Sequence, residues 1–209
     1  MPPERRRAGH TRVNDGACDR RGRLWLGSME YAGAPNGGCL YRIDLAGRLT
    51  VQLSPTTVSN GIGWSPDGQT MYFIDSGART VTAFAYRDGE LGEPRIVVQV
   101  DEAGAVPDGM CVDDDGCLWV AIWGAGEVRR FDPDGSLLAR VATPAARPSC
   151  CAFGGPDRDI LYITTARVGL TETELSLQPH AGCLLAVDVG VAGPAALPSR
   201  GPLEITDGT

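Results

Sequence analysis

The sequence LWL, at Leu24–Leu26, returns three more times along the chain with small changes. The later copies are MYF at Met71–Phe73, LWV at Leu118–Val120 and LYI at Leu161–Ile163. The central aromatic residues are 47, 47 and 43 residues apart, and a turn segment containing Asp and Gly precedes each copy. A repeat of about 40–50 residues built from strands and Asp-Gly turns is typical of a β-propeller blade. The sequence therefore predicts an all-β fold, a β-propeller with about four blades in this chain.

A second strand-like segment follows each copy of the first. The four segments are GCLYRIDL from Gly38, TVTAFAY from Thr80, EVRRFDP from Glu127 and GCLLAVDV from Gly182. They alternate apolar and polar residues, as half-buried strands do. With weaker outer strands, such as RLTVQL and PRIVVQV, they predict four consecutive four-stranded antiparallel blades between Arg12 and Asp188. No long helix is expected, and residues 171–182 are predicted to form an irregular insertion.

The repeats also predict the domain organisation. Residues 12–209 are expected to form one propeller domain, and residues 1–11 a disordered leader. Four blades lie at the lower limit of known propellers, so the domain is either a compact ring or an incomplete part of a larger one. An incomplete ring is an open arc with exposed blade edges, through which the chain is expected to form homo-oligomers.

Composition and charge exclude several classes of function. The net charge of −7 argues against nucleic acid and anionic membranes as partners. All 19 basic residues are Arg, which excludes Schiff-base chemistry on a lysine. The seven cysteines are odd in number and include no CxxC pair, so the predicted location is the reducing cytoplasm. The adjacent Cys150 and Cys151 are expected to be small core residues on opposite faces of a strand.

Polar residues recur at one position relative to the aromatic of each repeat. Asn14, Asn60 and Asp108 precede the aromatic by 11, 12 and 11 residues, and Ser149 and Cys150 occupy this position in the last repeat. In a propeller this position is the entry to the inner strand, at one rim of the axial channel. Oxygen-bearing side chains that converge without His or Cys suit a hard divalent cation such as Ca²⁺, Mg²⁺ or Mn²⁺.

A plainer explanation is that these Asn-Asp-Gly, Asn-Gly and Asp-Gly segments are turns, because such residues tolerate a left-handed backbone. The recurrence in register weakens this explanation. The other Asp-Gly pairs of the chain fall outside the register, so those pairs are predicted to be the turns. They begin at Asp67, Asp88, Asp115 and Asp134.

At these loops the sequence resembles the SMP-30/gluconolactonase family, also called the regucalcin or senescence marker protein family. The matching strings are RVNDGACD, SNGIGWSPDGQTMYFIDS, PDGMCVDDDGCLWVA, GEVRRFDPDG and SCCAFGG, and they cover the chain from about Arg12 to Asp188. The resemblance implies a six-bladed propeller with one divalent metal ion (Ca²⁺, Zn²⁺, Mn²⁺ or Mg²⁺) on its axis. It also implies hydrolysis of a small sugar lactone such as gluconolactone.

The same resemblance assigns roles to individual residues. Asn60 and Asp108 correspond to two metal ligands, and Asp108 also corresponds to the catalytic acid/base. Arg12 and Asn14 correspond to substrate contacts. Family members carry nearly two further blades before the RxNDG motif, including a third metal ligand, a Glu. No segment of this chain matches that Glu, since Glu4 lies in the predicted leader, and Glu30 is out of register with an acidic pair that is frequent in the family. The chain therefore resembles a family member that lacks its N-terminal part.

Three hypotheses for function follow. The first is a metal-dependent lactonase, in which the missing N-terminal blades impair activity. The second is a non-catalytic calcium-binding or scaffold propeller, which would bind metal without turnover. The third is a fragment that folds poorly and has no activity of its own.

Overall fold

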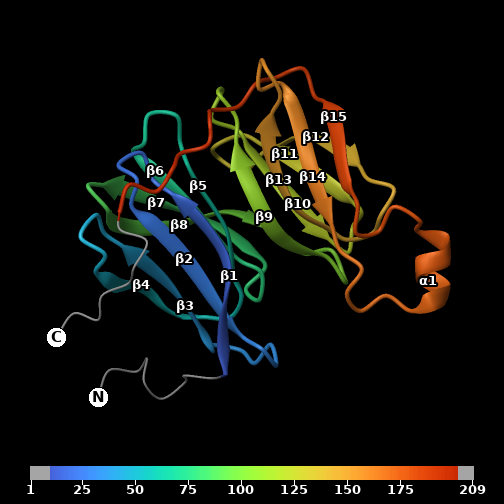
Figure 1. Ribbon diagram of the computed structural model, residues 1–209, viewed down its shortest axis with the longest axis horizontal. Helices are drawn as coiled ribbons and strands as arrows, with labels where there is room; N and C mark the ends of the chain where they lie inside the picture. Colours follow the sequence, from blue (N-terminus) through green and yellow to red (C-terminus); the bar gives the residue numbers. More distant parts are fainter. Residues whose placement is uncertain (1–9, 202–209) are drawn as a thin grey trace.

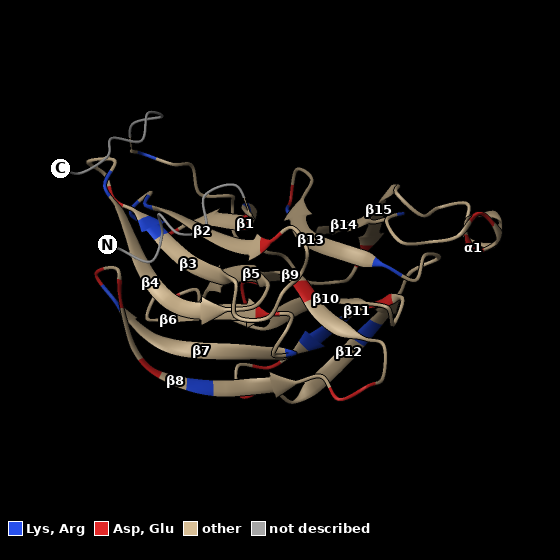
Figure 2. Cartoon of the chain, turned by 90° about the horizontal axis from the view of Figure 1, so that it is seen from below, with Lys and Arg blue, Asp and Glu red and all other residues tan. Residues whose placement is uncertain are grey.

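The structure is a computed structural model that describes residues 10–201. Its strands form four antiparallel sheets, each built from consecutive segments of the chain, with one short helix outside them. Figure 1 shows the four sheets in chain order, from blue to orange. Figure 2 shows β1, β5, β9 and β13 around the centre, with β4, β8 and β12 at the periphery. The arrangement confirms the prediction of a β-propeller with four blades.

The first two blades each contain four strands in simple up-and-down order. Blade 1 consists of β1 (Thr11–Cys18), β2 (Leu24–Glu30), β3 (Gly38–Ile43) and β4 (Leu49–Thr56). Blade 2 consists of β5 (Ser59–Trp64), β6 (Thr70–Asp75), β7 (Thr80–Arg87) and β8 (Glu90–Gln99). The aromatic residues that mark the repeats, Trp25 and Tyr72, lie in the second strand of each blade, as predicted.

The last two blades follow the same plan, with one difference. Blade 3 consists of β9 (Val106–Val112), β10 (Leu118–Trp123), β11 (Glu127–Phe131) and β12 (Leu137–Ala142). Blade 4 consists of β13 (Pro148–Gly154), β14 (Ile160–Thr165) and β15 (Leu184–Asp188). The expectation of four strands in every blade is therefore wrong for blade 4, which has three within the described residues.

The residues after β15 leave blade 4 instead of adding a fourth strand to it. Residues 189–201, called here the C-terminal strap, cross to blade 1 along the strand turns. The N–H of Asp114 donates to the carbonyl of Ala192 (2.9 Å), and the N–H of Arg200 donates to the carbonyl of Gly22 (3.0 Å). In Figure 1 the strap is the red segment that runs over the top from β15 to blade 1. Its backbone is thus bonded to other blades.

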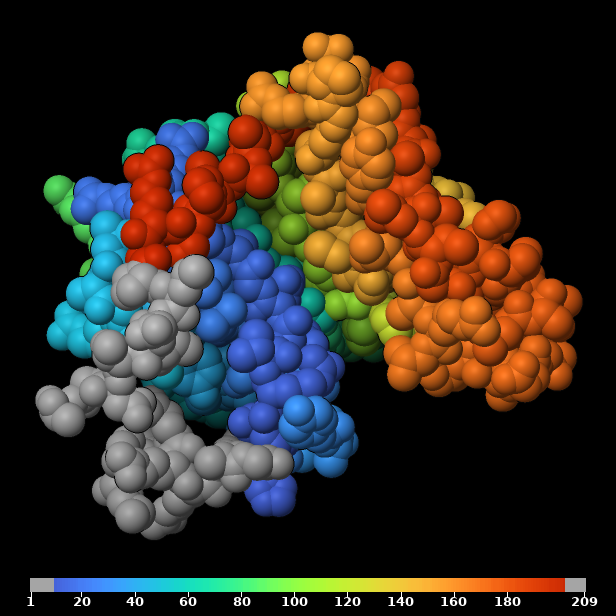
Figure 3. All heavy atoms as spheres, viewed as in Figure 1, coloured from blue at the N-terminus to red at the C-terminus, as the bar shows by residue number. Residues whose placement is uncertain are grey.

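Hydrophobic packing joins each blade to the next one along the chain. One buried cluster lies between blades 1 and 2, a second between blades 2 and 3, and a third between blades 3 and 4. Within residues 10–201 no such cluster joins blade 4 to blade 1. Figure 3 shows a notch between the blue and orange parts of the surface, crossed only by the red strap. The ring is therefore an arc that is open between blades 4 and 1.

The open side of the arc changes the solvent exposure of one of the four aromatic residues that mark the repeats. Trp25, Tyr72 and Trp119 pack toward the blade that follows them, and each is at most 3% exposed. Tyr162 occupies the equivalent position in blade 4, where its strand neighbours Leu161 and Ile163 pack against blade 3. Tyr162 itself is 37% exposed, because it faces the open side. Position in the repeat sets the direction of the side chain, and the next blade provides the burial.

The insertion before β15 contains a short helix, α1 (Glu172–Leu177). Its first turn is held by a capping box, in which the Thr171 Oγ1 accepts from the N–H of Glu174 (3.3 Å) and the Glu174 carboxylate accepts from the N–H of Thr171 (2.7 Å). The prediction of a wholly irregular insertion is thus wrong over six residues. No helix in residues 10–201 is long and apolar enough to cross a membrane.

The first described residues already belong to blade 1. Strand β1 begins at Thr11, and the carbonyl of His10 accepts from the N–H of Tyr31 (3.0 Å). Residues 1–9 of the predicted leader and residues 202–209 of the predicted domain lie outside the described residues.

A buried carboxylate ties together the strands of blade 3. Asp113 is fully buried, and its side chain accepts hydrogen bonds from the indole N–H of Trp119 (2.9 Å), the guanidinium of Arg130 (2.8 Å) and the backbone N–H of Cys117 (2.8 Å). Asp19 makes the equivalent contacts in blade 1 with Arg23. Removing Asp113 leaves the buried indole N–H of Trp119 and the buried backbone N–H of Cys117 without an acceptor, and it removes the buried charge partner of Arg130.

We predict that Asp113→Ala lowers the free energy of unfolding by about 3–5 kcal/mol, measured by urea denaturation. Asp115 provides a matched control, because it also bonds to Arg130 (3.0 Å) but is 69% exposed at its side chain. Asp115→Ala is expected to change stability by less than about 0.5 kcal/mol. Equal effects of the two substitutions would show that burial of Asp113 does not set its contribution.

Candidate functional site

The residues that recur in register lie at one end of the central channel. Asn14, Asn60, Asp108 and Ser149 all fall in the first four residues of the innermost strands, β1, β5, β9 and β13. In every blade the pairing of the inner strand with its neighbour shifts register at this point. Such irregularities re-aim side chains and are frequent beside active sites. The candidate site is therefore built on four strand irregularities, one from each blade.

The glycines that follow Asn60 and Asp108 are required by close approach between neighbouring inner strands. A Cβ on Gly61 would lie 2.8 Å from the carbonyl oxygen of Asp108, and a Cβ on Gly109 would lie 2.8 Å from the Cα of Cys150. Neither glycine has a positive φ. They are therefore strand residues selected for their lack of a side chain.

The remaining Asp-Gly pairs behave differently. Gly68, Gly89, Gly116 and Gly135 all have φ between 72° and 96°, the left-handed region that favours glycine. These pairs are turns, as the sequence predicted from their position outside the register. The same dipeptide thus has two structural roles in this chain, and its place in the repeat distinguishes them.

Hydrogen bonds, together with the peptide bond between Ser59 and Asn60, link the site residues into one chain across three blades. The guanidinium of Arg12 donates to the Oδ1 of Asn14 (2.8 Å), and the Nδ2 of Asn14 donates to the backbone carbonyl of Ser59 (3.1 Å). Next in the chain, the Nδ2 of Asn60 donates to the Oδ1 of Asp108 and to the hydroxyl of Ser76 (3.0 Å). The structure thus brings together all four residues that the sequence singled out.

Burial shifts the protonation of the carboxyls in this region. The pKa of Asp108 is raised to about 7: loss of contact with water is the main cause, the hydrogen bond from Asn60 opposes it, and the negative charge of Asp15 adds a smaller increase. Burial also raises the pKa of Asp15, and its bond from the N–H of Gly16 opposes the shift (2.7 Å). Two carboxyls that disfavour each other's charge provide a proton acceptor near neutral pH and a strong attraction for a cation.

Asp15 is the residue that reasoning from the sequence missed. It stands in the RVNDG segment directly after Asn14, which holds the place in register with Asn60 and Asp108. The register shift between Val13 and Gly16 accommodates Asn14 and Asp15 without regular partners on β2. The sequence did contain a signal for Asp15: it is a second residue with side-chain oxygen atoms, directly next to Asn14, which holds the repeated position.

The fourth inner strand contributes a neutral wall. Burial is the main cause of the raised pKa of the Cys150 thiol, and the charges of Asp15 and Asp108 add to it, so the group stays protonated. Cys151 is buried in the core as predicted, at 3% exposure, but Cys150 lines the channel and is not a core residue. Ser149 bonds to the hydroxyl of Thr164 (2.9 Å).

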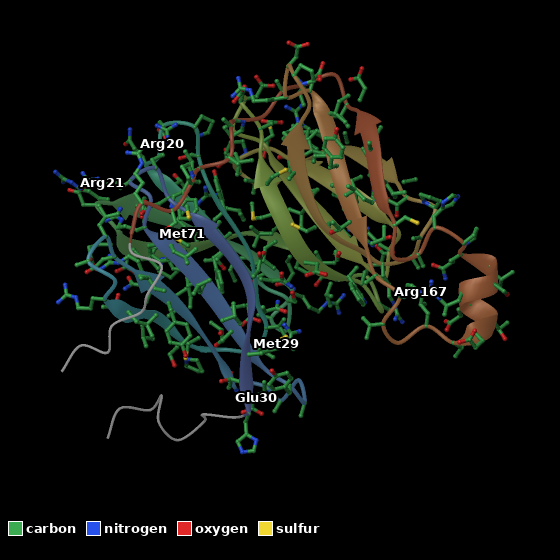
Figure 4. All side chains as sticks on the ribbon, viewed as in Figure 1. Arg20, Arg21, Met29, Glu30, Met71 and Arg167 are labelled. Carbon is green, nitrogen blue, oxygen red and sulfur yellow. The ribbon has the colours of Figure 1, made fainter. Side chains whose placement is uncertain are left out.

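The side chains fit a hard divalent cation in their chemistry. Carboxylate and amide oxygens are the donors that such ions take. No group of three His, Cys, Asp or Glu side chains that could hold a metal exists among residues 10–201. Ligation by Asn60 and Asp108 requires the amide of Asn60 to present its Oδ1 in place of the Nδ2, a half-turn of the amide. Glu30, which is labelled in Figure 4, is the last residue of β2 and pairs with Thr11 of β1.

A cavity of about 650 Å³ lies along the channel beside this site; Arg12, Asn14, Asn60 and Asp108 are not among its lining residues. Asp15 and Cys150 line it at the site end, and Pro194–Leu197 of the C-terminal strap line it at the other. Apolar residues of the inner strands, such as Ile62 and Met110, form much of the wall between. The volume is large enough for a small-molecule ligand.

The fold and the site define a β-propeller with an oxygen-donor site at one mouth of its channel. Comparison with known proteins gives the family: the model of the SMP-30/Gluconolactonase/LRE-like region matches residues 2–167. The chain belongs to this family, as the sequence motifs indicated.

The relatives include enzymes and calcium-binding proteins by name. The chain is 41% identical over 191 residues to L-arabinolactonase of Azospirillum brasilense, covering 88% of this chain and 62% of that protein. It is 40% identical over 190 residues to regucalcin of Danio rerio, covering 88% and 64%. A crystal structure titled as a calcium-binding protein, regucalcin, from Agrobacterium tumefaciens superposes with a TM-score of 0.87 at 30% identity, covering 91% of this chain and 65% of that one. The chain thus spans slightly less than two thirds of the length of these relatives.

We predict that Gly61→Ala destabilises the protein by about 2–3 kcal/mol, because the new methyl group meets the backbone of Asp108. Gly63→Ala, in the same strand, is the control: its Cβ would meet only side-chain atoms, the nearest being the Cγ2 of Val112 at 3.0 Å. Chemical denaturation of both variants measures the difference. A Gly63→Ala variant as unstable as Gly61→Ala would contradict the role assigned to close backbone approach.

The pKa of Asp108 gives a second prediction. A carboxyl with a folded pKa raised above its unfolded value stabilises the fold at low pH and loses that contribution as pH rises through about 7. In the presence of a chelator, Asp108→Asn should therefore be more stable than wild type at pH 8, by roughly 2–4 kcal/mol, and the gain should vanish near pH 4. Thermal unfolding at several pH values measures it. Asp101→Asn, at an exposed site, should show no such trend.

Proposed function

We propose that this site hydrolyses sugar lactones with the help of one divalent cation held by Asn60 and Asp108. The observation that carries the proposal is the contact between these two side chains at the channel mouth, where Asp108 is partly buried and its pKa is raised to about 7. A carboxyl of this kind suits both cation binding and proton transfer at physiological pH.

The names of the relatives support a lactone as the substrate class. One relative is named L-arabinolactonase, and the family description includes gluconolactonase. The names regucalcin and calcium-binding protein support a divalent cation. Because the chain spans less than two thirds of these proteins, the activity is proposed for the site and its residues.

Asp108 is proposed to act as the general base. Its carboxylate accepts a proton from the attacking water and returns it to the ring oxygen that leaves when the lactone opens. Loss of contact with water keeps the pKa of Asp108 close to neutral pH, so that both protonation states are accessible. A lactone is an activated ester, and no covalent nucleophile is required.

Arg12 and Asn14 are proposed to position the substrate. The guanidinium of Arg12 is exposed at the channel rim and offers donors to sugar hydroxyl or carboxylate oxygens. The guanidinium of Arg12 is held by its hydrogen bond to Asn14, and Asn14 is in turn bonded to Ser59 of blade 2. A divalent cation held by Asn60 and Asp108 would polarise the lactone carbonyl and stabilise the negative charge that develops on it.

The experiment is a pH-stat assay of gluconolactone hydrolysis, corrected for spontaneous opening, with added Ca²⁺, Mn²⁺ or Zn²⁺. Asp108→Ala is expected to lower kcat by about a thousandfold or more, because both cation binding and proton transfer are lost. Arg12→Ala should raise KM roughly tenfold with a smaller change in kcat, because it removes substrate binding. Asn60→Ala should recover part of its activity with excess metal, because the base remains.

Asp101→Ala, at an exposed position before β9, serves as the control and should retain wild-type kinetics. Calorimetry with the same metals separates binding from turnover. Wild-type activity in Asp108→Ala would overturn the assignment of the base. Metal binding that depends on Asp108 but comes with no lactone hydrolysis would instead favour a non-catalytic binding protein.

A further inference from the structure

The channel contains a pair of thiols in direct contact. Cys111 of β9 and Cys151 of β13 belong to neighbouring inner strands, and their Sγ atoms are 3.7 Å apart. Two blades are thus joined by sulfur atoms separated by little more than van der Waals contact. Both residues line the channel cavity. Neither is part of the hydrogen-bonded chain that connects the candidate site.

The close approach of the two strands explains this contact. At Gly109 the backbone of β9 lies so near to Cys150 that a Cβ would meet its sulfur, its Cβ and its Cα within 2.8 Å. Cys111 is two residues further along β9, and Cys151 is the next residue along β13. The same strand approach that brings Gly109 to blade 4 therefore brings the two thiols together.

The environments of the two thiols differ in a way that suits stepwise oxidation. Cys111 is partly exposed to the cavity, whereas Cys151 is 3% exposed and donates to the backbone carbonyl of Trp119 (3.2 Å). Burial and the contact with Cys111 raise the pKa of Cys151, which keeps it as a thiol. Cys111 is the sulfur that a small oxidant in the channel reaches first.

We propose that Cys111 and Cys151 form an oxidation site, at which a hydroperoxide such as hydrogen peroxide converts the two thiols into a disulfide between blades 3 and 4. The thiolate of Cys111 attacks one peroxide oxygen, and an S–O bond forms as the O–O bond breaks. The hydroxide that leaves takes up a proton and becomes water.

The sulfur of Cys151 then attacks the sulfenic sulfur of Cys111. An S–S bond forms as the S–O bond breaks, and the second hydroxide leaves with the Cys151 proton as another molecule of water. Overall, two thiols are oxidised and one hydrogen peroxide is reduced to two waters. The product closes a loop of about 40 residues that includes β10, β11 and β12, and it constrains the unfolded chain.

The test treats the reduced, purified protein with hydrogen peroxide, blocks remaining thiols with an alkylating reagent, and digests it with trypsin without reduction. The expected product is a cross-link between the peptides 96–129 and 141–158, with the loss of two hydrogen atoms. Oxidised protein should also unfold at a temperature higher by roughly 5–10 °C, and a reductant should reverse both changes.

Each of these peptides contains a second cysteine, which provides matched controls. Cys117→Ser and Cys150→Ser should keep the cross-link, whereas Cys111→Ser and Cys151→Ser should abolish it. Because Cys151 is buried and its variant is the one at risk of misfolding, the partly exposed Cys111 also tests the proposal independently. Cys183→Ser removes an exposed thiol and should leave the intramolecular cross-link unchanged.

Two results would overturn the proposal. One is a cross-link between the two peptides that survives in Cys111→Ser, which would assign the bond to Cys117. The other is the absence of any cross-link under conditions in which the exposed Cys183 is fully oxidised.

Discussion

The candidate site depends on how closely the inner strands of neighbouring blades approach each other. Gly61 faces the backbone of Asp108, and Gly109 faces Cys150, each at a distance that excludes even a methyl group. A side chain at Gly61 would press on the backbone of Asp108 and push apart the strands that carry Asn60 and Asp108. The glycine is therefore part of the site, although it carries no reactive atom. The spacing of the blades, and not the polar residues alone, determines whether the oxygen donors meet.

Much of this arrangement could be predicted from the sequence because it repeats. A constant interval between Trp25, Tyr72 and Trp119 gave the blades, and the common position of Asn60 and Asp108 gave the channel mouth. Asp15 could not be predicted in the same way, since a local shift in strand pairing, and not the period, accommodates it beside the site. The orientation of the Asn60 amide is likewise set by its neighbours Asp108 and Ser76.

The departures from the repeat have physical causes that lie far away in the sequence. The strap takes the place of a fourth strand in blade 4 because its backbone bonds to the turns of other blades, and repeat spacing does not reveal such partners. The helix α1 had a readable local signal, the Thr171 to Glu174 capping box, but six residues are too few for a periodic pattern. Tyr162 keeps its place in the repeat yet is exposed, since burial requires a neighbouring blade.

The C-terminal strap also constrains the order of events during synthesis. Blades 1, 2 and 3 are joined by clusters of residues that are close in the chain, so they can assemble one after another as the chain leaves the ribosome. The bond between Arg200 and Gly22 connects residues separated by most of the chain, and it forms only after Arg200 has emerged. Contacts over such a separation form slowly, because a long loop must close first. Until then, the turn of blade 1 that receives the strap is uncovered, and the nascent arc has a lifetime in which other chains can compete for that turn.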